Sequence, residues 1–164
     1  MLDLQYLHGI VVIRLRPTPQ RLMDHELPDR LGAALAYIGP DRSIVLTGTG
    51  DVFAPDFPAE DTLARSAAVR RLTEVRTGLL AHPRAVVAAV NGDADGAGWA
   101  LAEAADVRVM SGGLVRPSRA RSAGYPVTAA VAAGLVEYSS TPARLLDDAL
   151  TLAGRLEPRA VAAG

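Results

Sequence analysis

The stretch RAVVAAVNGDADGAGWALAEAADVRVMS, from Arg84 to Ser111, decides the fold of this chain. Its first part, 85–90, is a continuous run of small apolar and β-branched residues. Such a run is typical of a strand that is buried on both faces. Asn91 and Gly92 follow, and both residue types accept a positive φ, so we expect the strand to end there.

The second part of the same stretch predicts a helix and another strand. Glycines at 96 and 98 flank Ala97, and the segment 99–105 is rich in Ala, Leu and Glu, which favours a helix. The β-branched residues of 107–110 then predict a strand. A strand, a glycine-rich turn, a helix and a second strand form a βαβ unit, in which unpaired amides at the helix N-terminus attract a negatively charged oxygen.

Composition limits the classes of protein to which the chain belongs. It has 164 residues, 49% of them hydrophobic and 21% charged, with a formal net charge of −1, which favours one globular domain and argues against nucleic acid as the main partner. The absence of cysteine excludes disulfides and thiolate metal sites. The sequence shows neither a signal peptide nor an apolar run long enough to span a membrane, so we expect a cytoplasmic protein.

The remaining elements follow from hydrophobic spacing and from breakers. We expect strands near 5–7, 10–15, 43–47 and 135–138, and helices near 24–38, 61–81 and 142–156. We expect a short helix or turn at 127–133, a loop at 53–58 and irregular structure at 112–126. Asp24 and either Ser140 or Thr141 are the predicted caps of the first and last helices. The arginines of the 61–81 helix are expected to form a solvated face.

Five collinear segments resemble the crotonase superfamily of enoyl-CoA hydratases and isomerases. They are IVVIRLRP, LMD at 22–24, SIVLTGTGDVFAPDF, HPRAVVAAVNGDADGAGWALAEAADVRVMS and the final AAGLVEYSSTPARLLDDALTLAGRLEPRAVAA. The resemblance implies an α/β fold, the crotonase/ClpP-like repeated ββα superhelix, here truncated on its C-terminal side. It also implies one domain over 1–164, with its core at 10–111 and a shortened region at 112–164, in a trimer-based homo-oligomer or a hetero-assembly.

The chain departs from the family where hydration requires two glutamates as acid and base. The glutamate that follows the family's glycine triplet is replaced by Ala100, and Glu103 lies about one helical turn away. The segment that carries the second glutamate is expected to be deleted, because Ser111 runs directly into a Gly-, Pro- and Arg-rich stretch.

The resemblance assigns an oxyanion hole to the backbone N–H groups of Phe57 and Ala97, which would polarise a thioester carbonyl. Neither residue is proline, so both keep a donor. Asp56 stands where the family has glycine, and its charge is compatible with a thioester oxyanion only if its side chain points away. Asp93 and Asp95 are candidates for the missing acid and base, and the alternative is that they cap the following helix.

No cofactor other than a coenzyme A thioester, as substrate or ligand, is expected. Contacts to coenzyme A are predicted for Arg21, Ala54, Arg84 and Gly96, and for the arginines at 116, 119 and 121. Two functions stay open: an enzyme that stabilises an acyl-CoA or acyl-carrier enolate with altered chemistry, and a non-catalytic accessory subunit or pseudoenzyme. A copy without a role is a third alternative.

Overall fold

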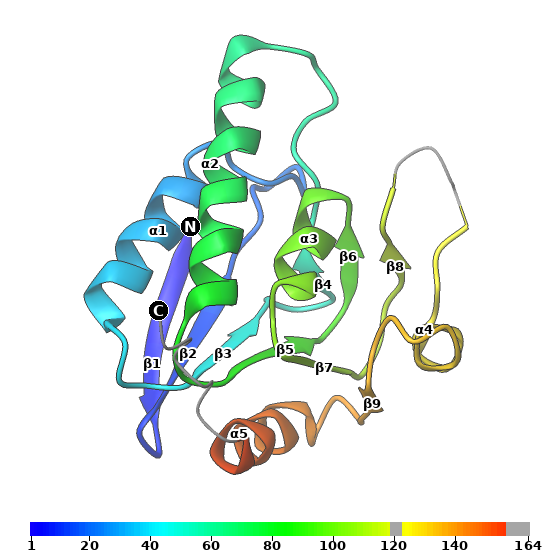
Figure 1. Ribbon diagram of the computed structural model, residues 1–164. Coiled ribbons are helices and arrows are strands. Elements are labelled where there is room, and N and C mark those ends of the chain that lie inside the picture. The colour runs from blue at the N-terminus through cyan, green and yellow to red at the C-terminus, as the bar shows by residue number, and fades with distance from the viewer. Residues whose placement is uncertain (119–122, 157–164) are drawn as a thin grey trace.

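The fold is built on a six-stranded sheet with a smaller three-stranded sheet beside it (Figure 1). The structure is a computed structural model that describes residues 1–118 and 123–156. The large sheet has the order β1-β2-β3-β5-β7-β9, formed by Leu2–Leu7, Ile10–Leu15, Ile44–Thr47, Val86–Val90, Val107–Met110 and Tyr138–Ser139. The small sheet has the order β4-β6-β8, formed by Val52–Ala54, Asp93–Asp95 and Val115–Arg116.

Two strands followed by a helix recur along the chain. The helices are α1 (Leu27–Ile38), α2 (Leu63–Ala81), α3 (Ala97–Glu103), α4 (Val127–Ala132) and α5 (Leu145–Arg155). The pairs β1–β2, β3–β4, β5–β6 and β7–β8 precede the first four helices in turn. In each of the second to fourth pairs, one strand joins the large sheet and the other the small sheet. This arrangement confirms the predicted repeated ββα fold.

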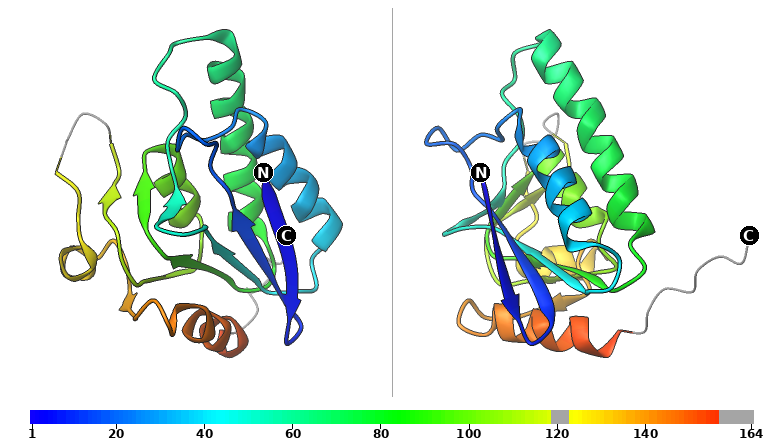
Figure 2. Two further views of the ribbon diagram at one scale, coloured as in Figure 1. Left: turned by 180° about the vertical axis from the view of Figure 1, so that it is seen from behind. Right: turned by 90° about the vertical axis from the view of Figure 1, so that its left-hand side faces the viewer.

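The large sheet is covered on both faces, as the two views of Figure 2 show. Alternate residues of a strand point to opposite faces. In β5, Val86, Ala88 and Val90 face the main core beneath α1, α2 and α3, whereas Val87 and Ala89 face α5. Burial on both sides explains why 85–90 is apolar without alternation.

Several helix boundaries differ from the prediction because local side-chain bonds compete with capping. The Asp24 carboxylate accepts the Glu26 N–H at 2.9 Å in a turn, and α1 begins three residues later, at Leu27. Ser140 donates its hydroxyl to Asp148 at 2.6 Å instead of capping α5, which begins at Leu145. None of the helices in 1–118 and 123–156 has the length and apolar character of a membrane span.

Candidate active site

The loop after β4 lies against the N-terminus of α3, because Gly98 has no side chain that would keep the helix away from Ala54. Ala54 ends β4 and is fully buried. Gly98, in the first turn of α3, lies so close to the Ala54 carbonyl that a Cβ would overlap it. The glycine therefore allows α3 to sit directly against β4, which brings residues 56–57 and 96–97 together.

The two predicted amides converge on one atom, and that atom belongs to the chain itself. The Phe57 N–H donates to Asp56 Oδ1 at 2.8 Å, and the Ala97 N–H donates to the same oxygen at 3.3 Å. The Asp56 side chain thus points toward the amides, and the condition that it should point away is not met. A carboxylate oxygen that accepts two backbone N–H groups lies where the resemblance predicts a thioester oxygen.

Gly96 makes room for this carboxylate. It is the N-cap residue of α3, with a φ of 50°, and a Cβ there would overlap the Asp56 carboxylate. The Asp56 backbone is held as well, because its carbonyl accepts the Met23 N–H at 2.9 Å. The Phe57 ring is buried and packs against the His25 ring with centroids 5.7 Å apart. The loop is therefore anchored on both sides of the carboxylate.

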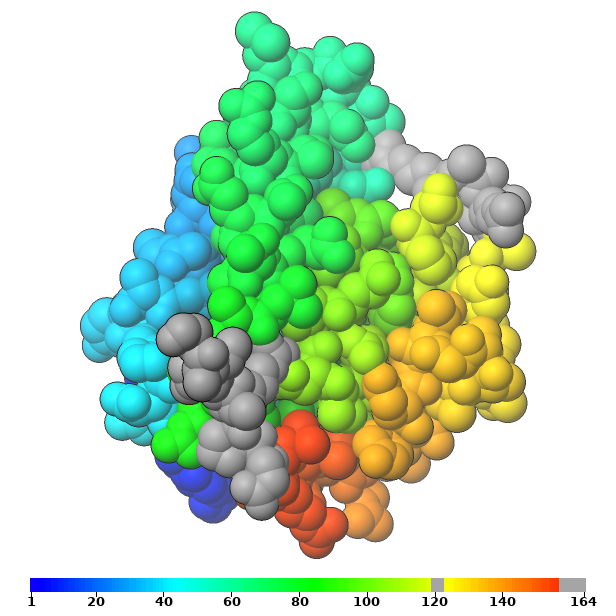
Figure 3. Space-filling model, viewed as in Figure 1, coloured from blue at the N-terminus to red at the C-terminus, as the bar shows by residue number. Residues whose placement is uncertain are grey.

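A cavity of about 400 Å³ adjoins the carboxylate, between α2 and α3. Its described lining consists of Asp56, Arg65, Val69, Leu72, Thr73, Arg76, Gly96, Ala97, Ala100, Pro117 and Ser118. Ala100, which the resemblance places at the family's first glutamate position, lines this cavity and contributes only a methyl group. Glu103 is exposed and does not occur in the described lining. In Figure 3, α2 forms a ridge along the surface with α3 beside it.

Arg65 and Arg76 are the site residues that the sequence analysis missed. Both are half-buried on the α3 side of α2, whereas the prediction placed them on a solvated face. Arg76 donates Nε–H to the Ala100 carbonyl at 3.0 Å, and Arg65 donates Nε–H to the Pro58 carbonyl at 3.0 Å. A signal existed for Arg76: it lies four residues after Leu72 and three before Leu79, on the apolar face of the helix.

Asp93 and Asp95 precede Gly96 in the chain, but their carboxylates are held by residues of β8 and of the turn before it. Both lie on β6 and pair with Arg116 of β8, whose Nη1 is 3.0 Å from Asp95 Oδ1 and 3.9 Å from Asp93 Oδ2. The hydrogen bond to Asp95 raises the pKa of Arg116. Asp93 also accepts the Leu114 N–H at 2.9 Å. The capping alternative is wrong, because the N-cap residue of α3 is Gly96. Neither carboxylate occurs in the described lining of the cavity.

The two described arginines predicted to contact coenzyme A at 21 and 84 do not lie at the Asp56 carboxylate. Arg21 is exposed and pairs with Asp51 at 3.1 Å, and this partner lowers the pKa of Asp51. Arg84 is exposed and precedes β5, whereas Gly96 follows β6. Gly96 lies against the Asp56 carboxylate, and Ala54 is buried against Gly98. The predicted contacts at 119 and 121 fall outside the described residues.

Comparisons with known proteins agree with this architecture. The family model described as enoyl-CoA hydratase/isomerase matches residues 6–113. The chain is 33% identical over 125 residues to the probable enoyl-CoA hydratase echA6 of Mycobacterium tuberculosis and to that of Mycobacterium bovis. Each alignment covers 68% of this chain and 47% of the relative, so the chain spans about half the length of the curated relatives it matches.

Solved structures show the same fold. A probable enoyl-CoA hydratase/isomerase from Mycobacterium abscessus superposes with a TM-score of 0.81 at 22% identity, covering 94% of this chain and 74% of that one. An enoyl-CoA hydratase from Bacillus anthracis superposes with a TM-score of 0.82 at 19% identity, covering 94% and 75%. The chain belongs to the enoyl-CoA hydratase/isomerase family, the crotonase superfamily.

Proposed function

We propose that this chain is a non-catalytic member of the crotonase superfamily, in which Asp56 serves as an internal ligand of the amide pair. The observation that carries the proposal is the convergence of the Phe57 and Ala97 N–H groups on Asp56 Oδ1, at 2.8 and 3.3 Å. A thioester oxygen would have to displace a carboxylate that accepts two charge-assisted hydrogen bonds. Such bonds contribute on the order of 1.5–3 kcal/mol each, more than bonds to a neutral carbonyl.

The methyl group of Ala100 supports the same proposal. The cavity beside Asp56 contains no second carboxylate among its described lining residues, so an acid–base pair for hydration is not available there. Partnership with a catalytic relative is then the role that such a member would fill. An accessory subunit of this kind needs the shape of the fold and not its chemistry.

A second candidate is an acyl-CoA or acyl-carrier thioester protein in which Asp56 rotates out when the ligand enters. It is favoured by one observation: the two amides remain aligned on a shared point beside a cavity. In that case they would stabilise an enolate, and coenzyme A would be part of the substrate or ligand and not a resident cofactor.

Isothermal titration with an acyl-CoA tests the internal-ligand role. We expect Asp56→Gly, which restores the family residue, to bind at least about tenfold more tightly than the natural chain, since one lost competing bond of about 1.4 kcal/mol is worth that factor. Thr151→Gly, an exposed position on α5, is the matched control and should leave binding unchanged. Equal affinity of the natural chain and Asp56→Gly would contradict the role assigned to Asp56.

Proton exchange separates the two candidates. In D₂O, the non-catalytic proposal expects no deuterium at the α carbon of the acyl group when the natural chain is present. If exchange occurs and Ala97→Pro abolishes it, the second candidate is favoured and the first is refuted. Proline removes the N–H donor, and it is well tolerated at the first residue of a helix, which Ala97 occupies in α3.

A further inference from the structure

Two arginines on α2 are anchored through Nε, and within the described part of the chain their Nη groups have no partner. Arg76 and Arg65 each use Nε–H for a bond to a backbone carbonyl, at Ala100 and Pro58 respectively. Among residues 1–118 and 123–156, no acid pairs with either guanidinium, and none forms a hydrogen bond with its Nη groups. A guanidinium fixed through Nε presents its Nη groups in a geometry suited to a carboxylate.

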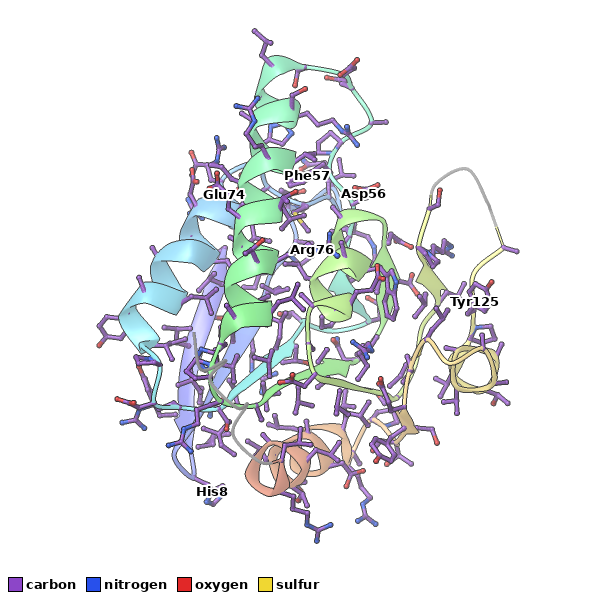
Figure 4. The ribbon with its side chains drawn as sticks, in the orientation of Figure 1. His8, Asp56, Phe57, Glu74, Arg76 and Tyr125 are labelled. Atoms are coloured by element: carbon purple, nitrogen blue, oxygen red, sulfur yellow. The ribbon has the colours of Figure 1, made fainter. Side chains whose placement is uncertain are left out.

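The charge of the cavity favours an anion. Its described lining contains these two cations and a single acid, Asp56, whose Oδ1 already accepts two amide bonds. Glu74, the acid on α2 nearest to Arg76 in sequence, lies in the groove between α1 and α2. Figure 4 shows the two residues on different sides of α2, with Arg76 toward α3. The cleft therefore carries an excess of positive charge on the face where a ligand would enter.

The spacing of the two arginines indicates a ligand with two charged ends. They are eleven residues apart on α2, which corresponds to about 16 Å along the helix axis. Because each is anchored to a different carbonyl, one carboxylate cannot satisfy both. Between them the cavity is lined by Val69, Leu72 and Thr73, and the Thr73 hydroxyl donates to the Val69 carbonyl of the same helix at 3.2 Å. The middle of the cleft is therefore mainly apolar.

We propose that the cleft between α2 and α3 binds a linear dicarboxylate with an aliphatic middle, one carboxylate on Arg76 and the other on Arg65. The aliphatic chain lies over Val69 and Leu72. The cavity, at about 400 Å³, is in the range of small-molecule sites. This inference goes beyond the proposed function, and it does not require Asp56 to leave the amide pair.

Calorimetric titration of the full chain with suberate at low ionic strength tests the inference, with octanoate as the ligand of equal length and one charge. We expect suberate to bind about tenfold more tightly than octanoate. Arg76→Gln and Arg65→Gln should each remove most of that difference. Arg70→Gln, an exposed position of the same helix outside the cavity lining, should keep it. Circular dichroism checks that each variant is folded, and Arg76→Lys should retain part of the difference because the charge is kept.

Equal affinities for suberate and octanoate, no heat of binding for either at millimolar concentration, or an equal effect of Arg70→Gln and Arg76→Gln would each overturn the inference. The Asp56→Gly variant keeps this test separate from that of the proposed function. If the internal-ligand role of Asp56 fails, acyl-CoA affinity is unchanged in Asp56→Gly, while the preference for suberate persists. If only the dicarboxylate site fails, Asp56→Gly still gains affinity for acyl-CoA.

Discussion

At the scale of single residues, the site depends on a match between Asp56 and Gly96. The carboxylate occupies the space that a side chain at position 96 would need, and the positive φ of Gly96 favours glycine independently. The resemblance places Asp56 where the family has glycine, and the Asp56 carboxylate fits here because position 96 has no Cβ. The Asp56 carboxylate and Gly96 act as one unit.

We expect Gly96→Ala to lower the free energy of unfolding by about 1–3 kcal/mol, from the cost of a positive φ with a Cβ and from displaced hydrogen bonds of Asp56. Urea denaturation measures the change. Gly154→Ala is the matched control, because Gly154 lies in α5 with no atom near the added Cβ, and it should be neutral or stabilising by up to about 1 kcal/mol. When Asp56 is replaced by alanine, Gly96→Ala should lower the free energy of unfolding by a smaller amount. Fully additive losses in the double variant would contradict the coupling between Asp56 and Gly96.

At the scale of elements, Arg108 joins the C-terminus of α3 to the strands beside it. From β7, its Nη1 donates to the carbonyls of Ala102, Glu103 and Ala105 at 3.0–3.2 Å. These carbonyls lie at the helix end, where intrahelical donors run out. Its Nη2 pairs with Glu137 at 2.5 Å, and the Arg108 side chain is 15% exposed. One cation therefore fixes the end of α3, whose other end carries Ala97.

Arg108→Gln should lower the free energy of unfolding by about 1–3 kcal/mol, because several partly buried acceptors lose a charged donor. Thermal unfolding monitored by circular dichroism measures the loss. Arg144→Gln serves as the control: its side chain is 75% exposed and lies 3.9 Å from Asp148, so removal should cost less than about 0.5 kcal/mol. Equal losses in the two variants would show that Arg108 contributes no more than a surface charge.

At the scale of the whole molecule, the large sheet separates two cores of unequal size. The larger lies beneath α1, α2 and α3, and the smaller lies between the sheet and α5. Ala149 is fully buried at the centre of the smaller core, against the face of β5 that carries Val87 and Ala89. The small side chains on both sides allow α5 to pack closely against the sheet.

Ala149→Glu should reduce the free energy of unfolding by about 3 kcal/mol or more, because an unpaired carboxylate would be buried between α5 and the sheet. Equilibrium urea denaturation is the measurement. Thr151→Glu introduces the same side chain at an exposed position of α5 and should change stability by less than about 0.5 kcal/mol. A small effect at Ala149 would mean that α5 does not cover this face in solution.

The sequence by itself determined the buried strand at 85–90, since hydrophobic runs and glycine-rich turns act locally and need no knowledge of distant partners. The family and the repeated ββα architecture followed from the resemblance of five collinear segments to the crotonase superfamily. The resemblance also predicted that the Phe57 and Ala97 amides share an acceptor. Only the tertiary structure decided that this acceptor is Asp56, and that Arg76 faces the cleft. Both facts depend on contacts between residues far apart in the chain: 41 positions separate Asp56 from Ala97, and 24 separate Arg76 from Ala100. The direction in which a carboxylate or a guanidinium points is set by those contacts, which no local pattern encodes.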